Sequence, residues 1–338
     1  MFRFPKRTVT ILAVDGGGIR GIIPAVILEH LKGRLEARGI RKEFHQCFDL
    51  MAGTSTGSII ILGLSVPSED KKSPAYSISD IRSVYENRGR EIFPPVRFNS
   101  IRTISQVWTE KYDHRPLENI LEEYFGNRSL RDALTNVMVT AFDTEHTRPF
   151  IMKNRQADRG GEEELNFYMK DAARASSAAP TFLELPCVSA LNADKNFSLL
   201  DGGVFANNPA MCAFIEARKI YPRARKFVIL SLGTGRAEWG YSYEEVKDWG
   251  YIDWVRPSKG TPLFRMIMRG QSECVAHHLS RIDEVEYIRI NGRLDAGREL
   301  MDDARESNIE GLKRAAEQFI AEHDNELNRI TEILSQRR

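Results

Sequence analysis

The stretch TVTILAVDGGGIRGIIPAVILEHLKGRLEAR, residues 8–38, decides the fold. Its first seven residues, Thr8 to Val14, are apolar or β-branched and predict a buried β-strand. Asp15 to Gly21 predict a glycine-rich turn, and an amphipathic helix is predicted from about Pro24 to Arg38. A buried strand that leads through a tight turn into a helix is typical of a parallel α/β sheet.

The same order of strand, turn and helix recurs further along the chain. Phe48 to Ala52 predict a strand, and Ser58 to Val66 predict an apolar helix. Further strands are predicted over Leu134 to Asp143, Ser198 to Asp201, Lys226 to Leu232 and Val285 to Ile290. Strands that alternate with helices indicate a mostly parallel central sheet with helices on both faces. We expect one domain over residues 1–338, with a lid-like insertion at about 67–115 and a C-terminal helical segment at about 302–336.

Net charge, apolar runs and cysteine content exclude several classes of protein. The 338 residues include 48 Lys and Arg against 47 Asp and Glu, a net charge of +1, which argues against a nucleic-acid polymer as partner. No apolar run reaches the ~18 residues that a membrane-spanning helix needs. The four cysteines, Cys47, Cys187, Cys212 and Cys274, are too sparse for a disulfide scaffold. These features predict a cytoplasmic protein that visits the inner membrane transiently, as a peripheral protein.

The clearest motif is Gly53-Thr54-Ser55-Thr56-Gly57, a G-x-S-x-G pattern between a predicted strand and a predicted helix. That setting is typical of a nucleophile elbow, in which a sharp turn exposes the serine hydroxyl above the sheet edge. The free N–H groups of the following helix would add partial positive charge. The alternative is a turn of small residues with an incidental serine.

Two further motifs also lie at predicted strand ends. The loop Asp15-Gly16-Gly17-Gly18-Ile19-Arg20-Gly21 would let backbone N–H groups approach an anion, either a phosphate or an oxyanion. Arg20 would brace this loop, meet an anionic head group or form a surface ion pair. Asp201-Gly202-Gly203 would place a carboxylate at the sheet edge, or form an ordinary Asx turn. Together the three motifs supply a nucleophile, a base and an oxyanion hole for acyl transfer.

On these motifs the sequence resembles the patatin-like phospholipases, which share the D-G-G-G-x-R-G loop, the G-x-S-x-G serine and the D-G-G aspartate. Arg174 to Pro180 and Leu232 to Gly235 also look like family sequence, and the likeness runs from about Val9 to Ile290. The resemblance implies a three-layer α/β/α sandwich and a lipid acyl hydrolase of the phospholipase A type. It implies a catalytic dyad without cofactor or metal, in which Ser55 is the nucleophile and Asp201 the base. The implied oxyanion hole is made by Gly16, Gly17, Gly18 and Thr56, and the implied supporting residues are Asp15, Arg20, Gly21, Gly53, Gly57, Gly202 and Gly203.

The resemblance also implies partners. Membrane phospholipids would be met at the bilayer surface, and residues 90–108 offer the expected mixture of apolar and basic side chains. These are Arg90, Ile92, Phe93, Val96, Arg97, Phe98, Ile101, Arg102, Ile104, Val107 and Trp108. Ordinary packing of an insertion explains the same pattern. Some compact bacterial members of this family serve as anti-phage effectors, and similarity to them would imply activation by a cyclic dinucleotide. The competing interpretation is a lipid acyl hydrolase without such control. A homo-oligomer is compatible with the sequence.

Three other hypotheses stay open at this point. A Ser–Asp–His hydrolase would use His277 or His278 after Ser55 and Asp201 in chain order. A non-catalytic nucleotide-binding regulator would use only the glycine-rich loop. A metal site would use His45, Cys47 and Asp49, which alternate along the chain, although strand positions explain them better.

Overall fold

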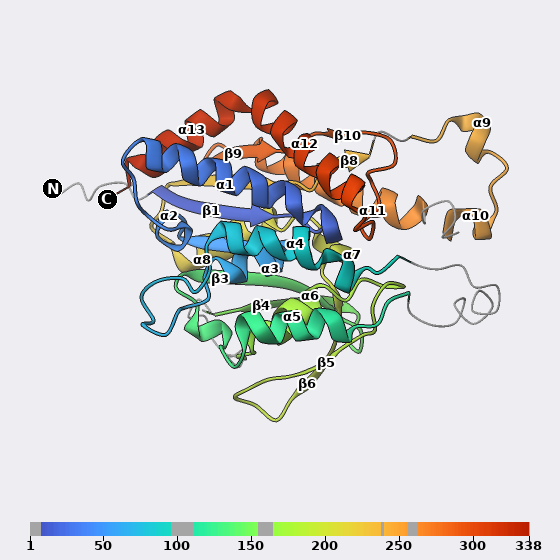
Figure 1. Cartoon of the computed structure of the whole chain (residues 1–338), viewed down its shortest axis with the longest axis horizontal. Helices are drawn as coiled ribbons and strands as arrows, with labels where there is room; N and C mark the ends of the chain where they lie inside the picture. The colour runs from blue at the N-terminus through green and yellow to red at the C-terminus, as the bar shows by residue number, and fades with distance from the viewer. Residues whose placement is uncertain (1–7, 96–110, 155–164, 238–239, 256–261, 338) are drawn as a thin grey trace.

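The computed structural model describes residues 8–95, 111–154, 165–237, 240–255 and 262–337. Its centre is one sheet with the strand order β5-β6-β3-β2-β1-β7-β9, and β4 also pairs with β3 (Figure 1). Five strands are parallel: β1 (Thr8–Val14), β2 (Leu50–Thr54), β3 (Asn136–Asp143), β7 (Lys226–Leu232) and β9 (Val285–Ile290). The predicted, mostly parallel sheet is therefore confirmed.

One side of the sheet is antiparallel. β4 (Arg148–Lys153) and β6 (Asn196–Asp201) both run against β3, and β5 (Cys187–Ser189) runs against β6. The sequence predicted the strand that ends at Asp201 but not its direction, because a strand this short carries no signal for the path of the chain that leads into it.

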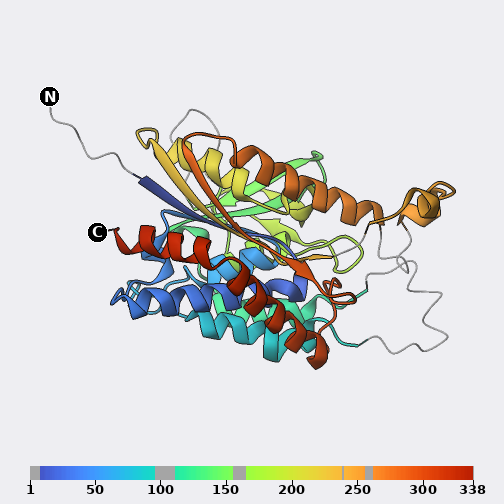
Figure 2. The ribbon, with the colours of Figure 1, turned by 90° about the horizontal axis from the view of Figure 1, so that it is seen from above.

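Helices cover both faces of the sheet, as Figure 2 shows from above. One layer holds α1 (Ile22–Ala37), α3 (Thr56–Gly63), α4 (Ile78–Ile92), α5 (Arg115–Phe125), α6 (Met169–Ser176), α12 (Glu306–Glu322) and α13 (Asp324–Ser335). The other holds α8 (Ala210–Ile220) and the end of α11 (Pro262–Leu279). Each layer buries its own apolar cluster against the sheet, so the chain forms the three-layer sandwich that was expected.

Short elements complete the chain. They are α2 (Phe44–Cys47), α7 (Gly203–Ala206), α9 (Tyr243–Val246), α10 (Tyr251–Val255), the 3-10 helices Gly18–Gly21 and Leu130–Asp132, and the small sheet of β8 (Arg236–Ala237) with β10 (Arg293–Leu294). None of the described helices combines the length and the apolar character that crossing a bilayer requires.

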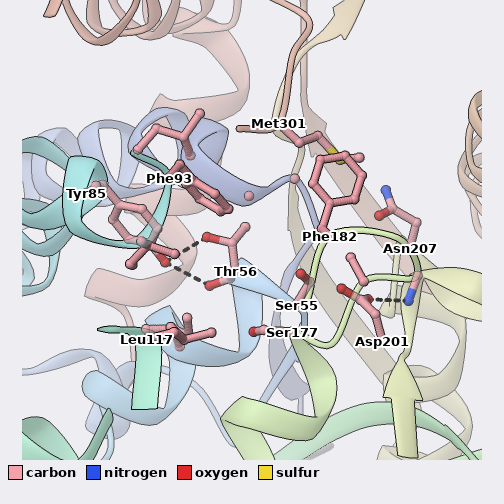
Figure 3. A pocket seen from close by; sticks show the side chains of 18 of the residues that line it. Ser55, Thr56, Tyr85, Phe93, Leu117, Ser177, Phe182, Asp201, Asn207 and Met301 are labelled. Carbon is pink, nitrogen blue, oxygen red and sulfur yellow. Dashed lines mark hydrogen bonds between the residues drawn. The ribbon is translucent and has the colours of Figure 1, made fainter. Parts of the chain in front are cut away.

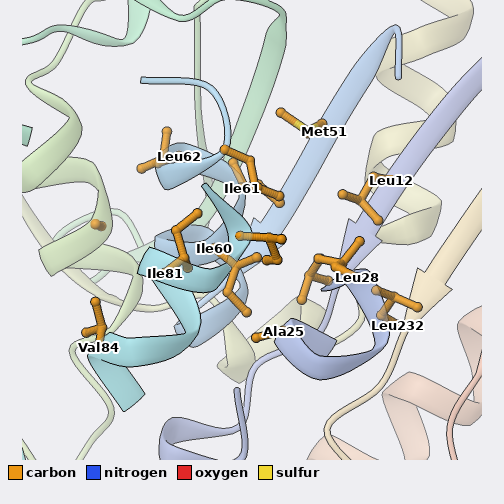
Figure 4. Packing of buried hydrophobic residues seen from close by; sticks show 14 of the residues in the cluster. Leu12, Ala25, Leu28, Met51, Ile60, Ile61, Leu62, Ile81, Val84 and Leu232 are labelled. Carbon is orange, nitrogen blue, oxygen red and sulfur yellow. The ribbon is translucent and has the colours of Figure 1, made fainter. Parts of the chain in front are cut away.

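The insertion expected over residues 67–115 contributes to the core. α4 lies inside it and packs against α1, and Ile81 and Val84 are buried beside Ile60 of α3 (Figure 4). This part of the insertion therefore belongs to the helical layer. Residues 96–110, on which much of the expected lid falls, lie outside the described residues.

Candidate active site

Ser55 occupies a sharp turn between β2 and α3, as predicted for a nucleophile elbow. Its backbone has φ 54° and ψ −123°, a conformation that non-glycine residues rarely adopt. The two flanking glycines are required by close approach of backbone. A Cβ on Gly53 would lie 2.3 Å from the carbonyl oxygen of Gly57, and one on Gly57 would lie 2.1 Å from that of Val14. The tightness of the turn is thus encoded by the glycines of the motif.

Hydrogen bonds hold the elbow in this strained conformation. The Ser55 N–H donates to Ser176 Oγ at 2.8 Å, and the Ser58 hydroxyl donates to the Ser55 carbonyl at 2.6 Å. Ser176 ends α6 and opens a loop that continues to Ala178. The elbow therefore depends on a segment about 120 residues further along the chain, whose sequence looked like family sequence but had no predicted role.

Asp201 reaches the same edge of the sheet from the opposite direction. It is the last residue of β6 and pairs with Ala141 of β3, next to Thr140, which pairs with Thr54 of β2. β3 extends beyond the end of β2, so β6 can run back along that extension and finish beside the elbow. The sequence argument placed Asp201 at this edge of the sheet without assigning a direction to its strand.

The surroundings of Asp201 make its carboxylate a better base. Its N–H donates to the carbonyl of Ala178 at 3.0 Å, and its Oδ1 accepts from the N–H of Gly203 at 2.7 Å. Burial raises the pKa of Asp201 to about 6, while the hydrogen bonds from Gly203 and the Ser55 hydroxyl oppose part of that rise. A carboxylate with this pKa is ionised at neutral pH and accepts a proton more readily than an exposed aspartate.

The glycine-rich loop lines the same cavity as Asp201. Gly18 has φ +59°, and a Cβ there would lie 2.1 Å from the Met301 carbonyl oxygen. Within the described part of the chain, the N–H groups of Gly17 and Gly18 have no hydrogen-bond acceptor. Thr56 is the first residue of α3, where helical N–H groups also lack internal partners. These three amides are available to bind an oxyanion.

Gly16 requires a correction. Its N–H already donates to the carbonyl of Asn207 at 3.1 Å, so it is not a free donor as expected. Its carbonyl accepts from the hydroxyl of Thr234 at 2.8 Å, and a Cβ on Gly17 would lie only 2.4 Å from that hydroxyl. Gly16 therefore fixes the loop in place, and the neighbouring strand end that contains Thr234 holds it there.

Asp15 and Arg20 hold the two ends of the glycine-rich loop. The buried carboxylate of Asp15 pairs with Arg289 of β9, with the two guanidinium nitrogens at 2.8 and 2.5 Å from its oxygens. Arg20 donates to the carbonyls of Gly17 at 3.3 Å and Gly235 at 3.4 Å. Of the roles considered for Arg20, these contacts match the brace. Arg289 carried no sequence motif, so sequence reasoning missed it.

The nucleophile, the carboxylate and the glycine-rich loop line one cavity, whose empty space is about 780 Å³ when the part open to solvent is included (Figure 3). Most of its wall is apolar, and the residues that form the apolar part are Ile19, Ile59, Ile92, Phe93, Leu117, Ala179, Phe182, Phe264, Met268 and Met301. Tyr85 joins the wall from α4: its hydroxyl accepts from Thr56 Oγ1 at 2.7 Å and donates to the Thr56 carbonyl at 3.0 Å. The cavity thus combines a small polar end with a long apolar surface.

The histidines of the alternative triad and the residues of the metal hypothesis do not line the cavity. His277 and His278 are exposed on α11, and the described residues that line the cavity include no histidine. This arrangement argues against a Ser–Asp–His triad. Asp49, at the opposite end of β2, accepts from the N–H of Thr10 at 2.8 Å and pairs with Arg337 at 2.8 Å.

Comparisons with known proteins agree with this arrangement. The family model described as patatin-like phospholipase matches residues 12–214. The chain is 32% identical to patatin-like protein 1 of Oryza sativa subsp. indica, over 96% of this chain and 84% of the relative. It is 32% identical to patatin-like protein 2 of Arabidopsis thaliana, over 92% and 83%, and 29% identical to patatin group D-2 of Solanum tuberosum, over 98% and 91%.

Proposed function

Because the chain belongs to the patatin-like phospholipase family and is therefore a serine hydrolase of lipid acyl esters, we propose that Ser55 and Asp201 form its catalytic dyad. The substrates we propose are fatty-acyl esters of membrane phospholipids, cleaved through an acyl-enzyme. The observation that carries the proposal is the meeting of elbow, carboxylate and free amides at the polar end of one apolar cavity.

The dyad would work in two half-reactions. Ser55 Oγ attacks the ester carbonyl while its proton passes to the Asp201 carboxylate, and the new C–O bond turns the carbonyl oxygen into an oxyanion. The N–H groups of Gly17, Gly18 and Thr56 stabilise that charge. The intermediate then expels the alcohol, which takes the proton from Asp201. Water attacks the acyl-enzyme by the same route, releasing the fatty acid and restoring Ser55.

The oxyanion hole must supply much of the rate. Even with a pKa of about 6, Asp201 is a weak base toward a serine hydroxyl. One well-placed donor to an oxyanion lowers an acyl-transfer barrier by about 3 to 4 kcal/mol. The positions of the Gly17 and Gly18 amides should therefore matter nearly as much as the nucleophile.

An exposed apolar surface beside the cavity supports contact with a bilayer. Large hydrophobic side chains stand exposed on α9, α10 and the start of α11, and they are Tyr243, Tyr251, Ile252, Val255, Leu263, Met266 and Ile267. Phe264 and Met268, on another face of α11, line the cavity itself. A lipid would thus pass from this surface into the site along a single helix. Of the contact residues expected over 90–108, Ile92 and Phe93 line the cavity, and those from Val96 to Trp108 lie outside the described residues.

Polar substitution of this surface should separate two activities. We expect Ile252→Ser with Ile267→Ser, at positions 69% and 46% exposed, to lower hydrolysis of phospholipid vesicles about tenfold, because less apolar area enters the bilayer. Hydrolysis of a water-soluble ester should stay within about twofold, since neither side chain lines the cavity. Equal losses on both substrates would exclude this surface as the membrane contact.

Mass spectrometry of the products from mixed phospholipid vesicles tests the function. The wild-type enzyme should release free fatty acid and the matching lysophospholipid in equal amounts, and Ser55→Ala should release neither. Release of phosphorylated head groups instead would contradict acyl-ester cleavage.

Activation by a cyclic dinucleotide in anti-phage defence stays a prediction from the family resemblance, and a homo-oligomer stays compatible with the sequence. Adding cyclic dinucleotides to the vesicle assay distinguishes an enzyme that the nucleotide activates from one that is not regulated by it. A rise in product that depends on the nucleotide and on Ser55 would favour the regulated effector, and an unchanged rate would favour unregulated lipid turnover.

A further inference from the structure

Tyr85 of α4 holds the residue that follows the nucleophile. Its hydroxyl accepts from Thr56 Oγ1 at 2.7 Å and donates to the Thr56 carbonyl at 3.0 Å, and Figure 3 draws both bonds. One hydroxyl therefore binds Thr56 twice, once at its side chain and once at its backbone. Tyr85 is 5% exposed and Thr56 is 3% exposed, so water competes little for these two bonds.

The glycine-rich loop leaves room for this pair. A Cβ on Gly21, the last residue of the loop motif, would lie 2.2 Å from Thr56 Oγ1 and 2.8 Å from the ring of Tyr85. A larger residue at this position would therefore push Thr56 and Tyr85 out of place. The loop that supplies the amides of Gly17 and Gly18 thus packs directly against the pair.

The peptide group between Ser55 and Thr56 is held at both ends. The Ser55 carbonyl accepts from the Ser58 N–H at 2.8 Å and from the Ser58 hydroxyl at 2.6 Å, both in the first turn of α3. Because this peptide group is trans, the Thr56 N–H points opposite to that carbonyl, out of the N-terminal end of the helix. Tyr85 fixes the other end of the group at Thr56, so its two bonds limit how far the N–H can turn.

We propose that Tyr85 is a positioning residue of the oxyanion hole, which holds the Thr56 N–H at the angle that the oxyanion requires. This inference rests on the proposed function, in which that amide acts together with those of Gly17 and Gly18. A displaced donor loses much of its effect, because a hydrogen bond weakens steeply as it bends and lengthens. α4 lies within the insertion over residues 67–115, so the insertion contributes to catalysis through this hydroxyl.

The Tyr85 hydroxyl acts through Thr56 and not on the ester. Its single hydrogen is donated to the Thr56 carbonyl, and its oxygen accepts from Thr56 Oγ1. It therefore has no proton to give to the reacting atoms while both bonds are in place.

Replacing the carbonyl oxygen of the substrate with sulfur makes the role of Tyr85 testable. In the intermediate of a thionoester the negative charge lies on sulfur, which is larger than oxygen and accepts weaker hydrogen bonds. A working oxyanion hole therefore favours the oxoester, and a displaced donor reduces that preference. Damage to the nucleophile or the base leaves the preference unchanged, because both esters need these groups equally.

The experiment compares wild type with Tyr85→Phe on two soluble p-nitrophenyl esters of the same short acyl chain, an oxoester and a thionoester. We expect kcat on the oxoester to fall about 10- to 30-fold, less than for complete loss of an oxyanion-hole donor, with KM within about twofold. Turnover of the thionoester should fall no more than about threefold. That remaining turnover also reports that the variant is folded.

Thr56→Val tests whether the effect passes through Thr56. Valine keeps the shape of threonine but lacks Oγ1, so only the bond from Tyr85 to the carbonyl can remain. The loss on the oxoester should be smaller than in Tyr85→Phe. The double variant should lose about as much as Tyr85→Phe alone, because that change already removes both bonds. Losses that simply multiply in the double variant would overturn the proposal.

Tyr221→Phe is the matched control. The Tyr221 hydroxyl shows the same pattern of bonds, since it accepts from Asn136 Nδ2 at 2.8 Å and donates to the carbonyl of Asp49 at 3.3 Å, at the opposite end of β2. Its loss should leave turnover of both esters within about twofold of wild type.

Two results would overturn the positioning role while leaving the dyad intact. They are equal losses on both esters in Tyr85→Phe, and no loss on either ester. Activity that survives Ser55→Ala would instead overturn the proposed function itself.

Discussion

Replacing Asp201 with asparagine should lower kcat/KM about 10³-fold, within the usual contribution of a general base. Asparagine has nearly the same shape and its Oδ1 can still accept from the N–H of Gly203, so the loop should keep its geometry. The amide cannot take the proton of Ser55, however, and attack on the ester would depend on water as the base. Steady-state kinetics with a soluble ester measures the loss.

The pH dependence of the wild-type enzyme also tests whether Asp201 is the general base. Burial raises the pKa of Asp201 to about 6, and only the ionised carboxylate acts as a base. Below pH 6 the rate should therefore fall about tenfold for each pH unit, and above it kcat/KM should reach a plateau. In Asp201→Asn this acid limb should disappear.

Asp143 offers a matched control for this substitution. It is another buried aspartate, at the end of β3, and it does not line the cavity; its carboxylate bonds to His146 at 2.8 Å. Asp143→Asn should keep the wild-type pH profile and most of the activity. If it instead removed the acid limb, the assignment of that limb to Asp201 would be wrong.

Gly18→Ala should have the second large effect, a loss of about 10²- to 10³-fold in kcat, comparable to the loss of an oxyanion-hole donor. The substitution places a Cβ 2.1 Å from the Met301 carbonyl oxygen in a left-handed conformation, so the loop must shift and carry the Gly17 and Gly18 amides away. The nucleophile and base remain in place. Single-turnover kinetics of acylation measures the effect directly.

Gly33→Ala is the control for this second prediction. Gly33 lies within α1, and a Cβ there meets nothing within 4 Å. Alanine should leave the kinetics unchanged and raise stability by about 0.5 to 1 kcal/mol, the usual gain inside a helix. Normal acylation by a folded Gly18→Ala enzyme would exclude the glycine-rich loop as the oxyanion hole.

Local sequence patterns predicted the central strands well. β1 and β7 have the predicted bounds, Thr8–Val14 and Lys226–Leu232, because both are mostly apolar and every residue after the first is buried. The sequence also predicted the elbow, since the requirement for Gly53 comes from Gly57 within the turn itself, although the requirement for Gly57 comes from the distant Val14. Signals of this kind depend on short stretches of chain.

Features that depend on contacts between distant parts of the chain could not be predicted from the sequence. Nothing local distinguishes Gly16, whose N–H bonds to the carbonyl of Asn207, from Gly17, whose N–H has no acceptor among the described residues. Arg289 pairs with Asp15 across 274 residues, and no spacing rule links them. The segment 236–270 gave no clear pattern because its short helices expose much of their apolar surface, which blurs the usual periodicity.

Covalent capture of the nucleophile tests the central claim most directly. A fluorophosphonate reacts with serines that have an adjacent base and an oxyanion hole, so peptide mass spectrometry after labelling identifies the residue that carries the adduct. The adduct should lie on Ser55, form slowly in Asp201→Asn and be absent from Ser55→Ala. An adduct on a different serine, or undiminished labelling of Ser55→Ala, would contradict the dyad.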